Sequence, residues 1–316
     1  MTVRGLAGGA SGRAVAANPT GRTVDGMTTR HDLKQLFRAI GRVTGGRALE
    51  AAPVDRKDQA AGTDVIDDDP ARVAVPPVVA DAYVDGIQAA MVLTHVAHRP
   101  VYLSFVSAGA VDGACRPLDV EETLKLVCSH LDRDYVESLR STVPVHPLAS
   151  ELPPDVERSA HQQLGGDRAD HETTVVQRAL NRGGFVVVDG GLSARSESAA
   201  IGGVVKTDAT KYLPDERVLY SLPAGWRSPR FKIPAGRGAD VERWSCYVRL
   251  HPAEQHHWTF GLIRLETFSL DMLEPLAALT LTKRQFASSG DSRFDRHLQP
   301  VRRCEDFLRS RRPKVF

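Results

Sequence analysis

Hydrophobic positions recur along most of the chain but not at its N-terminus. Residues 1–30 are rich in Gly, Ala, Thr and Arg without periodicity, which predicts a disordered tail. From Asp32 to Val43 apolar residues recur at helical spacing, so we expect an amphipathic helix there. Residues 47–74 are polar and acidic, as in a linker. We therefore expect three parts: a disordered tail (1–30), a helix and linker (31–72), and an ordered domain (73–316).

The ordered domain alternates short apolar runs with helical segments, which is typical of an α/β fold with a mixed central sheet flanked by helices. Runs of β-branched and aromatic residues predict strands at 78–93, 101–106, 185–189, 201–205, 244–250 and 258–265, the last two as a hairpin. Helical periodicity predicts helices at 119–140, 155–180, 270–282 and 295–311, with a break in the second at Gly165-Gly166.

Composition changes this picture little. With 42% hydrophobic and 25% charged residues and a net charge of +2, the chain resembles an ordinary globular protein, and its charge favours no class of partner. No run approaches the roughly 18 apolar residues that span a bilayer, and no apolar segment follows Arg4 and Arg13 as in a secretory signal. We expect a cytoplasmic protein without membrane contact, whose translation starts at Met1 or at Met27.

Three groups of residues suggest metal sites but have simpler explanations. The cysteines form no CxxC pair, so we expect free thiols instead of a zinc site; they are Cys115, Cys128, Cys246 and Cys304. Adjacent aspartates at 67–69, before Pro70, are typical of a solvated turn. His256 and His257 are neighbours, and neighbouring side chains of a strand point to opposite faces, so we expect this pair to lie in a loop.

Basic residues concentrate near the C-terminus, where they are Arg302, Arg303, Arg309, Arg311, Arg312 and Lys314. They either contact phosphates or form a solvated helix face, since Glu305 and Asp306 interrupt the cluster. Arg264 and Glu266 alternate with apolar residues and share one strand face, which is either a solvated surface or the wall of a charged channel. Arg264, Arg302 and Arg303 are thus the candidate contacts with the phosphates of a nucleic acid.

Two aspartates occupy similar positions at predicted strand ends, in Val84-Asp85-Gly86 and Val188-Asp189-Gly190. The following glycine lets the backbone turn and approach a ligand closely. Asp-Gly is also a common turn dipeptide, but a carboxylate at the end of a buried strand such as 185–189 requires a partner. Ligand sites gather at the carboxyl ends of strands, so the two aspartates form one site if their strands are neighbours.

Glu172 and Lys206 are the further candidates for this site. Glu172 lies on the predicted helix that leads into the Asp189 strand, and Lys206 ends the strand that follows. Asp85, Glu172 and Asp189 together supply the oxygen ligands that suit Mg²⁺ or Mn²⁺, and the Lys206 ammonium would contact a scissile phosphate or a carboxylate. Alternatively, Glu172 faces solvent on a highly charged helix, and Lys206 lies at the surface.

The order of these motifs resembles the NurA family of DNA-repair nucleases, which have an RNase H-like fold. The first shared motif is Val84-Asp85-Gly86, and the second is Glu172 with the helix into Phe185–Leu192. The third is Ile201–Lys206, similar to the family's Gly-Val-x-Lys strand, and Gly261–Glu266 is similar to its Ile-Arg-x-Glu strand. The resemblance extends from about residue 75 to residue 312.

This resemblance implies a metal-dependent nuclease that cleaves single- and double-stranded DNA, by exo- or endonucleolytic attack, in end processing, repair or defence against foreign DNA. It implies a homodimer and a HerA-like hexameric ATPase as partner. It also implies Asp85, Glu172 and Asp189 as ligands of Mn²⁺ or Mg²⁺.

Two departures from the family pattern favour rival hypotheses. Gly191 replaces the family's serine, and no histidine follows Leu298 where the family places an active-site histidine; His297 precedes it, and Arg302 stands near that position. A catalytically weak or inactive DNA-binding adaptor of the same fold is therefore an alternative. A third is an actin-like ATPase, which would require a glycine-rich phosphate loop, whereas Gly202-Gly203 lies inside a predicted strand.

Overall fold

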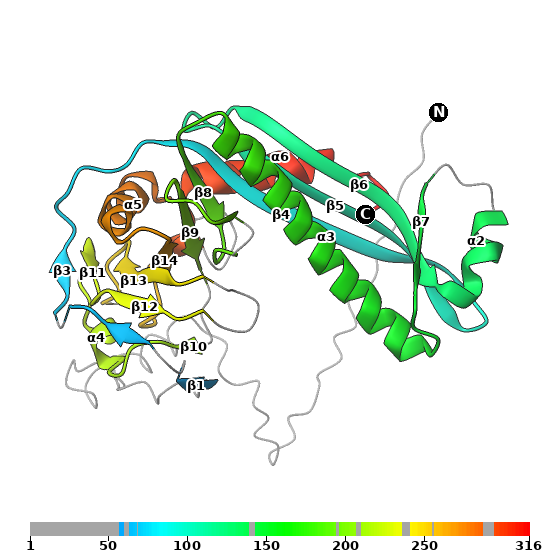
Figure 1. Cartoon of the computed structure of the whole chain (residues 1–316), viewed down its shortest axis with the longest axis horizontal. Coiled ribbons are helices and arrows are strands. Elements are labelled where there is room, and N and C mark those ends of the chain that lie inside the picture. Colours follow the sequence, from blue (N-terminus) through cyan, green and yellow to red (C-terminus); the bar gives the residue numbers. More distant parts are fainter. Residues whose placement is uncertain are drawn as a thin grey trace, which may run out of the picture. The chain divides into compact units, whose positions relative to one another are not determined.

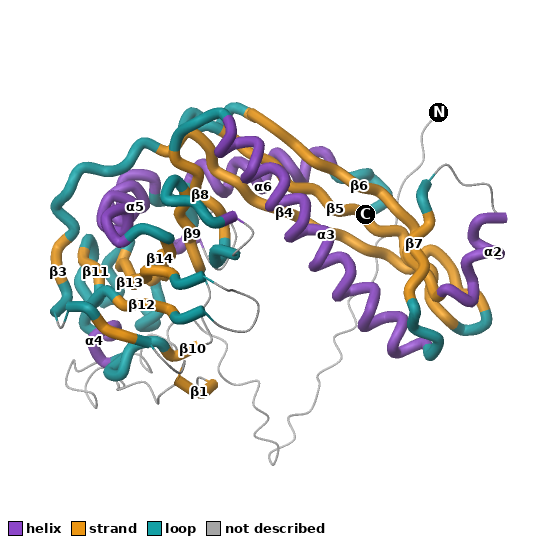
Figure 2. Tube along the Cα trace, in the orientation of Figure 1, coloured by secondary structure: helices purple, strands orange, loops and turns teal. Residues whose placement is uncertain are grey.

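Strands dominate the described part of the chain, and most of them join one mixed sheet of twelve strands (Figures 1 and 2). The computed structural model describes residues 57–59, 63–67, 69–138, 143–193, 196–206, 210–235, 241–254, 256–286 and 294–316. The expected tail (1–30), the helix at 32–43 and the start at Met27 lie outside these residues. By its contacts, Asp55–Phe316 forms one compact unit.

The large sheet has the strand order β2-β12-β13-β14-β9-β8-β4-β5-β6-β7, with β11 joining β13 to β3. Its strands are β2 (Asp64–Val65), β3 (Ala71–Arg72), β4 (Ala80–Val96), β5 (Arg99–Val111), β6 (Pro117–Ser129), β7 (Val145–Leu148), β8 (Phe185–Asp189), β9 (Ile201–Val205), β11 (Trp226–Arg227), β12 (Phe231–Ile233), β13 (Arg243–Arg249) and β14 (Leu262–Thr267). A parallel group, β4-β8-β9, lies between antiparallel strands on both sides. Two further strands, β1 (Lys57–Gln59) and β10 (Thr210–Lys211), pair in parallel as a separate sheet.

Helices cover both faces of this sheet. They are the 3₁₀ helix η2 (His130–Asp132), α2 (Arg133–Ser138), α3 (Pro153–Asn181), α4 (Arg217–Tyr220), α5 (Leu270–Lys283), the 3₁₀ helix η4 (Phe294–Arg296) and α6 (Gln299–Arg311). The long helix α3 follows β4, β5 and β6 along one face, whereas α5 and α6 pack on the other (Figures 1 and 2). The predicted α/β class with a mixed sheet flanked by helices is therefore confirmed.

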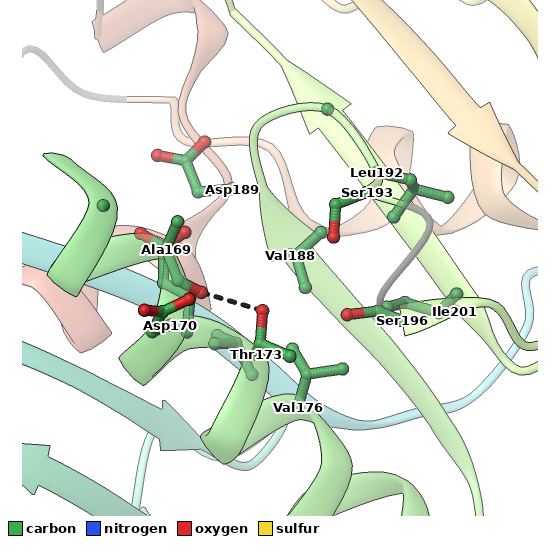
Figure 3. Close-up of a pocket in the computed structure, with 14 residues that line it drawn as sticks. Ala169, Asp170, Thr173, Val176, Val188, Asp189, Leu192, Ser193, Ser196 and Ile201 are labelled. Carbon is green, nitrogen blue, oxygen red and sulfur yellow. Dashed lines mark hydrogen bonds between the residues drawn. The ribbon is translucent and has the colours of Figure 1, made fainter. Parts of the chain in front are cut away.

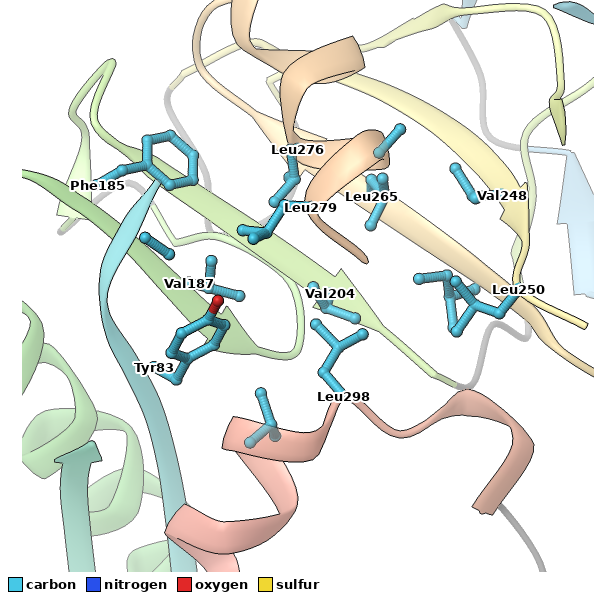
Figure 4. Close-up of a cluster of buried hydrophobic side chains, with 14 of the residues drawn as sticks. Tyr83, Phe185, Val187, Val204, Val248, Leu250, Leu265, Leu276, Leu279 and Leu298 are labelled. Atoms are coloured by element: carbon cyan, nitrogen blue, oxygen red, sulfur yellow. The ribbon is translucent and has the colours of Figure 1, made fainter. Parts of the chain in front are cut away.

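Two apolar cores lie on opposite faces of the sheet. Their members show to which face each side chain of the parallel strands points. Tyr83 and Val187 belong to the core beneath α5 and α6, whereas Val84 and Val186 belong to the core beneath α3. Figure 4 shows the first core, in which Tyr83, Val187 and Val204 meet leucines of α5 and Leu298. This alternation fixes the orientation of the polar residues at the strand ends.

Several predicted elements match the structure closely. The strands expected at 185–189 and 201–205 are β8 and β9, and the hairpin expected at 244–265 is β13 with β14, although residues 258–261 form its turn. The helices expected at 155–180 and 270–282 are α3 and α5, and α3 continues through Gly165-Gly166 without the expected break.

Three further expectations about secondary structure are wrong. The segment expected as a helix at 119–140 is mostly β6, because it pairs with β5 along its whole length, and helical residues begin only at His130. The expected linker contributes β1, β2 and β3 to the sheets. The last helix begins at Gln299 instead of residue 295, after the short turn of η4.

Candidate functional site

Asp85 and Asp189 lie at neighbouring positions of two adjacent parallel strands. Val84 of β4 is the register partner of Val188 of β8, and each aspartate comes next along its strand. Val84 packs beneath α3, so Asp85 points to the opposite face, which carries α6. Asp189 is the last residue of β8, so its carboxylate lies at the strand tip. The two strands are therefore neighbours, but the expectation that Asp85 ends a strand is wrong, because it is the sixth of the 17 residues of β4, which continues to Val96 by pairing with β5.

Lys206 supplies the positive charge next to this pair. It directly follows β9, which pairs in parallel with β8, and its Nζ lies 2.7 Å from Oδ2 of Asp189. Its side chain is only 7% exposed. The guanidinium of Arg296 in η4 donates to the Lys206 carbonyl at 2.9 Å. The strand and η4 therefore hold the backbone of Lys206 where its ammonium reaches the tip of β8.

Burial dominates the electrostatics of Asp85. Burial raises the pKa of this carboxyl well above its usual range, and the nearby Asp189 raises it further. The Lys206 ammonium and the Gly86 N–H, which donates to Oδ1 of Asp85 at 2.7 Å, act in the opposite direction. One ammonium thus faces two clustered carboxylates, so an additional cation or proton would stabilise the site.

Glu172 approaches the same strands from the other face. It projects from α3 directly over Gly86, where a Cβ atom would overlap its Oε1, so only glycine leaves room for this carboxylate. Burial raises the pKa of Glu172, whereas Arg168 lowers it and Asp189 raises it. The Nε atom of Arg168 lies 3.6 Å from Oε1 of Glu172. The helix α3 therefore places Glu172 against β4, one residue beyond Asp85.

A pocket of about 440 Å³ opens between α3 and the end of β8. Glu172 and Asp189 both line it, and Figure 3 shows Asp189 beside the turn of α3 that carries Ala169 and Asp170. The far wall is small and polar, with Ser193 and Ser196. Asp170 lines it as well, so the pocket brings three acidic residues and hydroxyl groups to one open space, which suits a small polar ligand or a phosphate with its counter-cation.

The three predicted carboxylates do not meet at a single point. Asp189 is electrostatically coupled to both partners, but Asp85 lies on the α6 face and Glu172 on the α3 face. Among the described residues, no group of three His, Cys, Asp or Glu side chains is arranged to hold a metal ion. The structure therefore shows two pairs that share Asp189.

Glu305 is a site residue that the sequence reasoning missed. It lies on α6, which packs against β4, and after burial and Asp189 its carboxylate also raises the pKa of Asp85. Arg302 at 3.0 Å and Arg309 at 2.5 Å hold Glu305 in place. The preceding Cys304 donates from its thiol to the carbonyl of Gly109, the register partner of Asp85. No local motif marks Glu305, because its role depends on how α6 docks on the sheet.

The charged face of β14 supports the loop that follows Asp189. Glu266 is buried, and its carboxylate accepts hydrogen bonds from the Leu192 N–H at 2.8 Å and from Arg243 and Arg264. The guanidinium of Arg264 also lies over the Tyr212 ring, 4.5 Å from its centroid. Arg264 is therefore a buried structural residue, and its expected contact with DNA gains no support.

The other candidate DNA contacts and the remaining charged motifs have clear positions. Arg302 and Arg303 lie on α6, where both form ion pairs with Asp306. Asp67, expected in a solvated turn, instead accepts from Arg227 and Arg230. Three of the cysteines are buried, and all four are free thiols, as expected.

The glycines of β9 have a packing role. A Cβ atom at Gly202 would contact Leu276 and Phe185, and one at Gly203 would contact the Gly190 carbonyl and Leu192. Both glycines therefore allow close approach inside the sheet. This explains the Gly-Gly pair without a phosphate loop, so the actin-like hypothesis gains no support.

Comparisons with known proteins identify no relative. No model of a known protein family matches the chain, and no curated protein is significantly similar to it. Within the described residues, no helix is both long enough and apolar enough to cross a membrane. Function must therefore be argued from the site itself.

Proposed function

We propose that this protein is a divalent-metal-dependent DNA nuclease. The observation that carries the proposal is the pair of aspartates, Asp85 and Asp189, at adjacent register positions of parallel strands, with one buried ammonium beside them. Clustered acidic residues, one of which has its pKa raised by burial and by a neighbouring carboxylate as Asp85 does, are typical of catalytic sites. Phosphodiester hydrolysis is a reaction that such carboxylates support through bound cations.

The donor set fits a hard divalent cation. Asp85, Asp189 and Glu172 offer carboxylate oxygens, the ligands that Mg²⁺ and Mn²⁺ prefer. The single ammonium of Lys206 offsets only part of the negative charge of these carboxylates. A further carboxylate, Glu305, also raises the pKa of Asp85. A bound cation would lower the pKa of a water molecule and stabilise the leaving oxygen of the phosphodiester.

Each side chain has a distinct task in this proposal. Asp85 and Asp189 would hold a cation where β4 and β8 run side by side, and Glu172, on the other face of the sheet, would contribute together with Asp189 through the pocket that they share. Lys206 orients the scissile phosphate, since its stem is buried and its ammonium is held at the strand tip. Glu266 is a positioning residue, because it fixes the backbone of the loop after Asp189.

The topology supports a finer assignment of the fold. In the order β6-β5-β4-β8-β9, β5 runs antiparallel to both neighbours, whereas β4, β8 and β9 are parallel. The helix α3 precedes β8, and the two aspartates lie on β4 and β8, which are neighbours in this order and come first and fourth of these five strands along the chain. This arrangement is compatible with an RNase H-like core and with the resemblance to NurA nucleases.

The proposed partners follow from that resemblance. The substrate is DNA, in repair or in defence against foreign DNA, and a HerA-like hexameric ATPase would supply it to a nuclease homodimer in the cytoplasm. Co-purification with such an ATPase and light scattering of the isolated protein test the two associations separately.

The decisive experiment measures hydrolysis of linear single- and double-stranded DNA in Mn²⁺ or Mg²⁺. We expect the wild type to cleave, and Asp189→Ala to be slower by at least about 100-fold, the loss typical of removing a group that stabilises the transition state. Asp155→Asn, an exposed aspartate in the first turn of α3, is the matched control and should cleave normally. Equal cleavage by wild type and Asp189→Ala would refute the assignment.

One observation favours a second candidate, a DNA-binding adaptor without catalytic activity. No three ligands are already arranged for a metal within the described residues, and Lys206 already pairs with Asp189. An adaptor would leave DNA intact in every divalent metal while binding it with a strong dependence on salt.

A further inference from the structure

Two pockets on the α5–α6 side of the sheet share one exposed aromatic side chain, Phe286. The first, the aromatic pocket, has a volume of about 370 Å³, and its walls include His251, His256, Phe260 and Phe294 together with one carboxylate, Glu254. The second, the arginine pocket, has a volume of about 490 Å³, and its walls include Arg284, Gln299, Arg302, Arg303 and Asp306. Because Phe286 lines both, the two form one continuous surface, separate from the pocket beside Asp189.

Phe286 is presented to solvent by its neighbours. It is 74% exposed, while the Arg284 guanidinium lies over its ring at 4.9 Å from the centroid and His251 meets it edge-on at 6.0 Å. A cation over the ring and a perpendicular imidazole orient Phe286 without burying it. The ring therefore provides an aromatic surface that a flat ligand can cover.

The aromatic pocket itself is built for flat groups. The rings of His256 and Phe260 stack with centroids 3.9 Å apart and planes at 16°, and Phe260 meets Phe294 edge-on at 5.9 Å. Stacked and edge-on rings of this kind give one wall a planar aromatic character. A nucleobase, which has both a π-face and polar edges, is a suitable occupant.

The arginine pocket carries an excess of positive charge. Three arginines and one carboxylate, Asp306, line it, and Glu305 also pairs with Arg302 at 3.0 Å, which leaves an excess of one positive charge. The ion pairs of Arg302 and Arg303 with Asp306, at 3.2 and 3.8 Å, hold the guanidinium groups along α6. The positive charge favours binding of an anion. Because an aromatic pocket lies next to it, the anion that fits is the phosphate of a nucleic acid strand.

Backbone contacts connect this surface to the proposed active site. The Gln285 N–H donates to the His297 carbonyl at 2.9 Å, and Arg284 and Leu298 form a β-bridge. Arg296 lies between Phe294 and His297 along the chain. Its guanidinium donates a hydrogen bond to the carbonyl of Lys206. A strand bound on this surface would thus lie on elements that also hold the tip of the parallel strands.

We propose that this surface binds single-stranded DNA, with phosphates at the arginine pocket and an unstacked base on Phe286 at the aromatic pocket. The choice of DNA rests on the proposed function, whereas the single-stranded state follows from this surface. A base paired within a duplex has no free face to stack on a side chain, while a single strand does. The surface therefore discriminates a single strand from a duplex.

The test measures binding of a fluorescent oligo-dT of about 12 nucleotides, a length within the range one single-strand site accommodates, by anisotropy in EDTA, so that no cleavage occurs. Phe286→Ala should weaken binding by about five- to 100-fold, the range for loss of one base–aromatic stack. Phe286→Trp should retain it. Tyr135→Ala is the matched control, because Tyr135 is also exposed but lies on α2.

The arginine pocket is tested by salt dependence. Arg303→Gln should reduce the slope of log K against log salt by about 0.7, the value for one phosphate contact in a single strand. Affinity for a duplex of the same length should be unaffected by Phe286→Ala. Circular dichroism of each variant checks that the fold is retained.

Three outcomes would overturn this inference. They are the absence of oligo-dT binding by the wild type, equal binding by Phe286→Ala and wild type, and an equal loss of duplex binding. A shift of Phe286→Ala from dimer to monomer in size-exclusion chromatography, without a change in DNA binding, would instead assign the surface to contacts between copies. Because binding is measured without divalent metal, a protein that binds but never cleaves would refute the nuclease and leave this surface intact.

Discussion

The Nζ atom of Lys206 lies 2.7 Å from Oδ2 of Asp189, and this contact places one buried ammonium beside two carboxylates of neighbouring strands. Asp85, the second carboxylate, has its pKa raised by burial and by Asp189, and Lys206 opposes that shift. Lys206 therefore contributes to the stability of the folded protein and takes part in the proposed chemistry of the site.

Lys206→Met should destabilise the metal-free protein by about 1–3 kcal/mol at neutral pH, between the values for exposed and fully buried ion pairs. The lysine is buried and Asp189 is partly exposed, so an intermediate cost is expected. Denaturant unfolding in EDTA measures it. Lys232→Met, which breaks a surface pair with Glu242, is the control and should cost less than about 1 kcal/mol. Equal costs for both variants would contradict the role assigned to Lys206.

Gly86→Ala should disturb Glu172 directly. The added methyl would overlap the Glu172 carboxylate and approach Arg168, so α3 or its side chains must move. We expect a loss of about 1–3 kcal/mol of stability, as for overpacking in a core, together with slower DNA cleavage. Gly165→Ala in α3 is the control, because its methyl would meet no atom within 4 Å, and it should stabilise the helix by about 0.5–1 kcal/mol. Normal cleavage by Gly86→Ala would show that Glu172 has no part in the site.

Local sequence patterns predict the strand tips of the site well. Phe185–Asp189 and Ile201–Val205 are short, wholly apolar runs bounded by turn signals, so their ends are visible without a structure. Lys206 therefore directly follows its strand as expected, whereas Asp85 lies inside β4, whose continuation to Val96 depends on its pairing with β5. The register that aligns Val84 with Val188 is a tertiary property, which the sequence did not reveal.

Elements that depend on distant partners were predicted poorly. Leu124, Val127 and Leu131 fit a helical spacing, but the segment instead forms backbone hydrogen bonds with β5 as the strand β6. The periodicity of the segment itself does not indicate that this partner strand is present. Glu305 was missed for a similar reason, since only the docking of α6 on β4 brings it near Asp85. The described part of the expected linker likewise folds because β11 and β12 are available as partners.

Glu305→Gln should test whether α6 contributes to the proposed metal site. Removing this charge weakens the acidic cluster around Asp85, so we expect a higher Mn²⁺ concentration at half-maximal cleavage, by about tenfold, the lower range for loss of a supporting group around a metal. Glu137→Gln, an exposed residue of α2, should leave the Mn²⁺ dependence unchanged. A Glu305→Gln protein with an unaltered Mn²⁺ curve would confine Glu305 to its ion pairs with Arg302 and Arg309.

Asp85→Asn should make the metal-free protein more stable at neutral pH while removing cleavage. Burial, and then Asp189, raise the pKa of Asp85 above the value of 3.8 for an unperturbed aspartate. Above pH 3.8 the unfolded chain has released this proton, but the native state keeps it until its own higher pKa is reached. The native state then binds more protons than the unfolded state, so the free energy of unfolding falls as pH rises through this interval.

Asparagine carries no charge at any pH, so this contribution disappears in the variant. The free energy of unfolding in EDTA, measured by denaturant at several pH values from about 4 to 8, should fall less steeply for Asp85→Asn than for wild type. The Glu172 carboxyl, whose pKa is also raised by burial, retains its own contribution in both proteins, so the difference between them isolates Asp85. Parallel curves would mean that Asp85 titrates alike in the folded and unfolded states. Asp85→Asn should be more stable than wild type without metal and should no longer gain stability from Mn²⁺. This result would indicate that Asp85 binds the cation and that its charge lowers the stability of the metal-free protein.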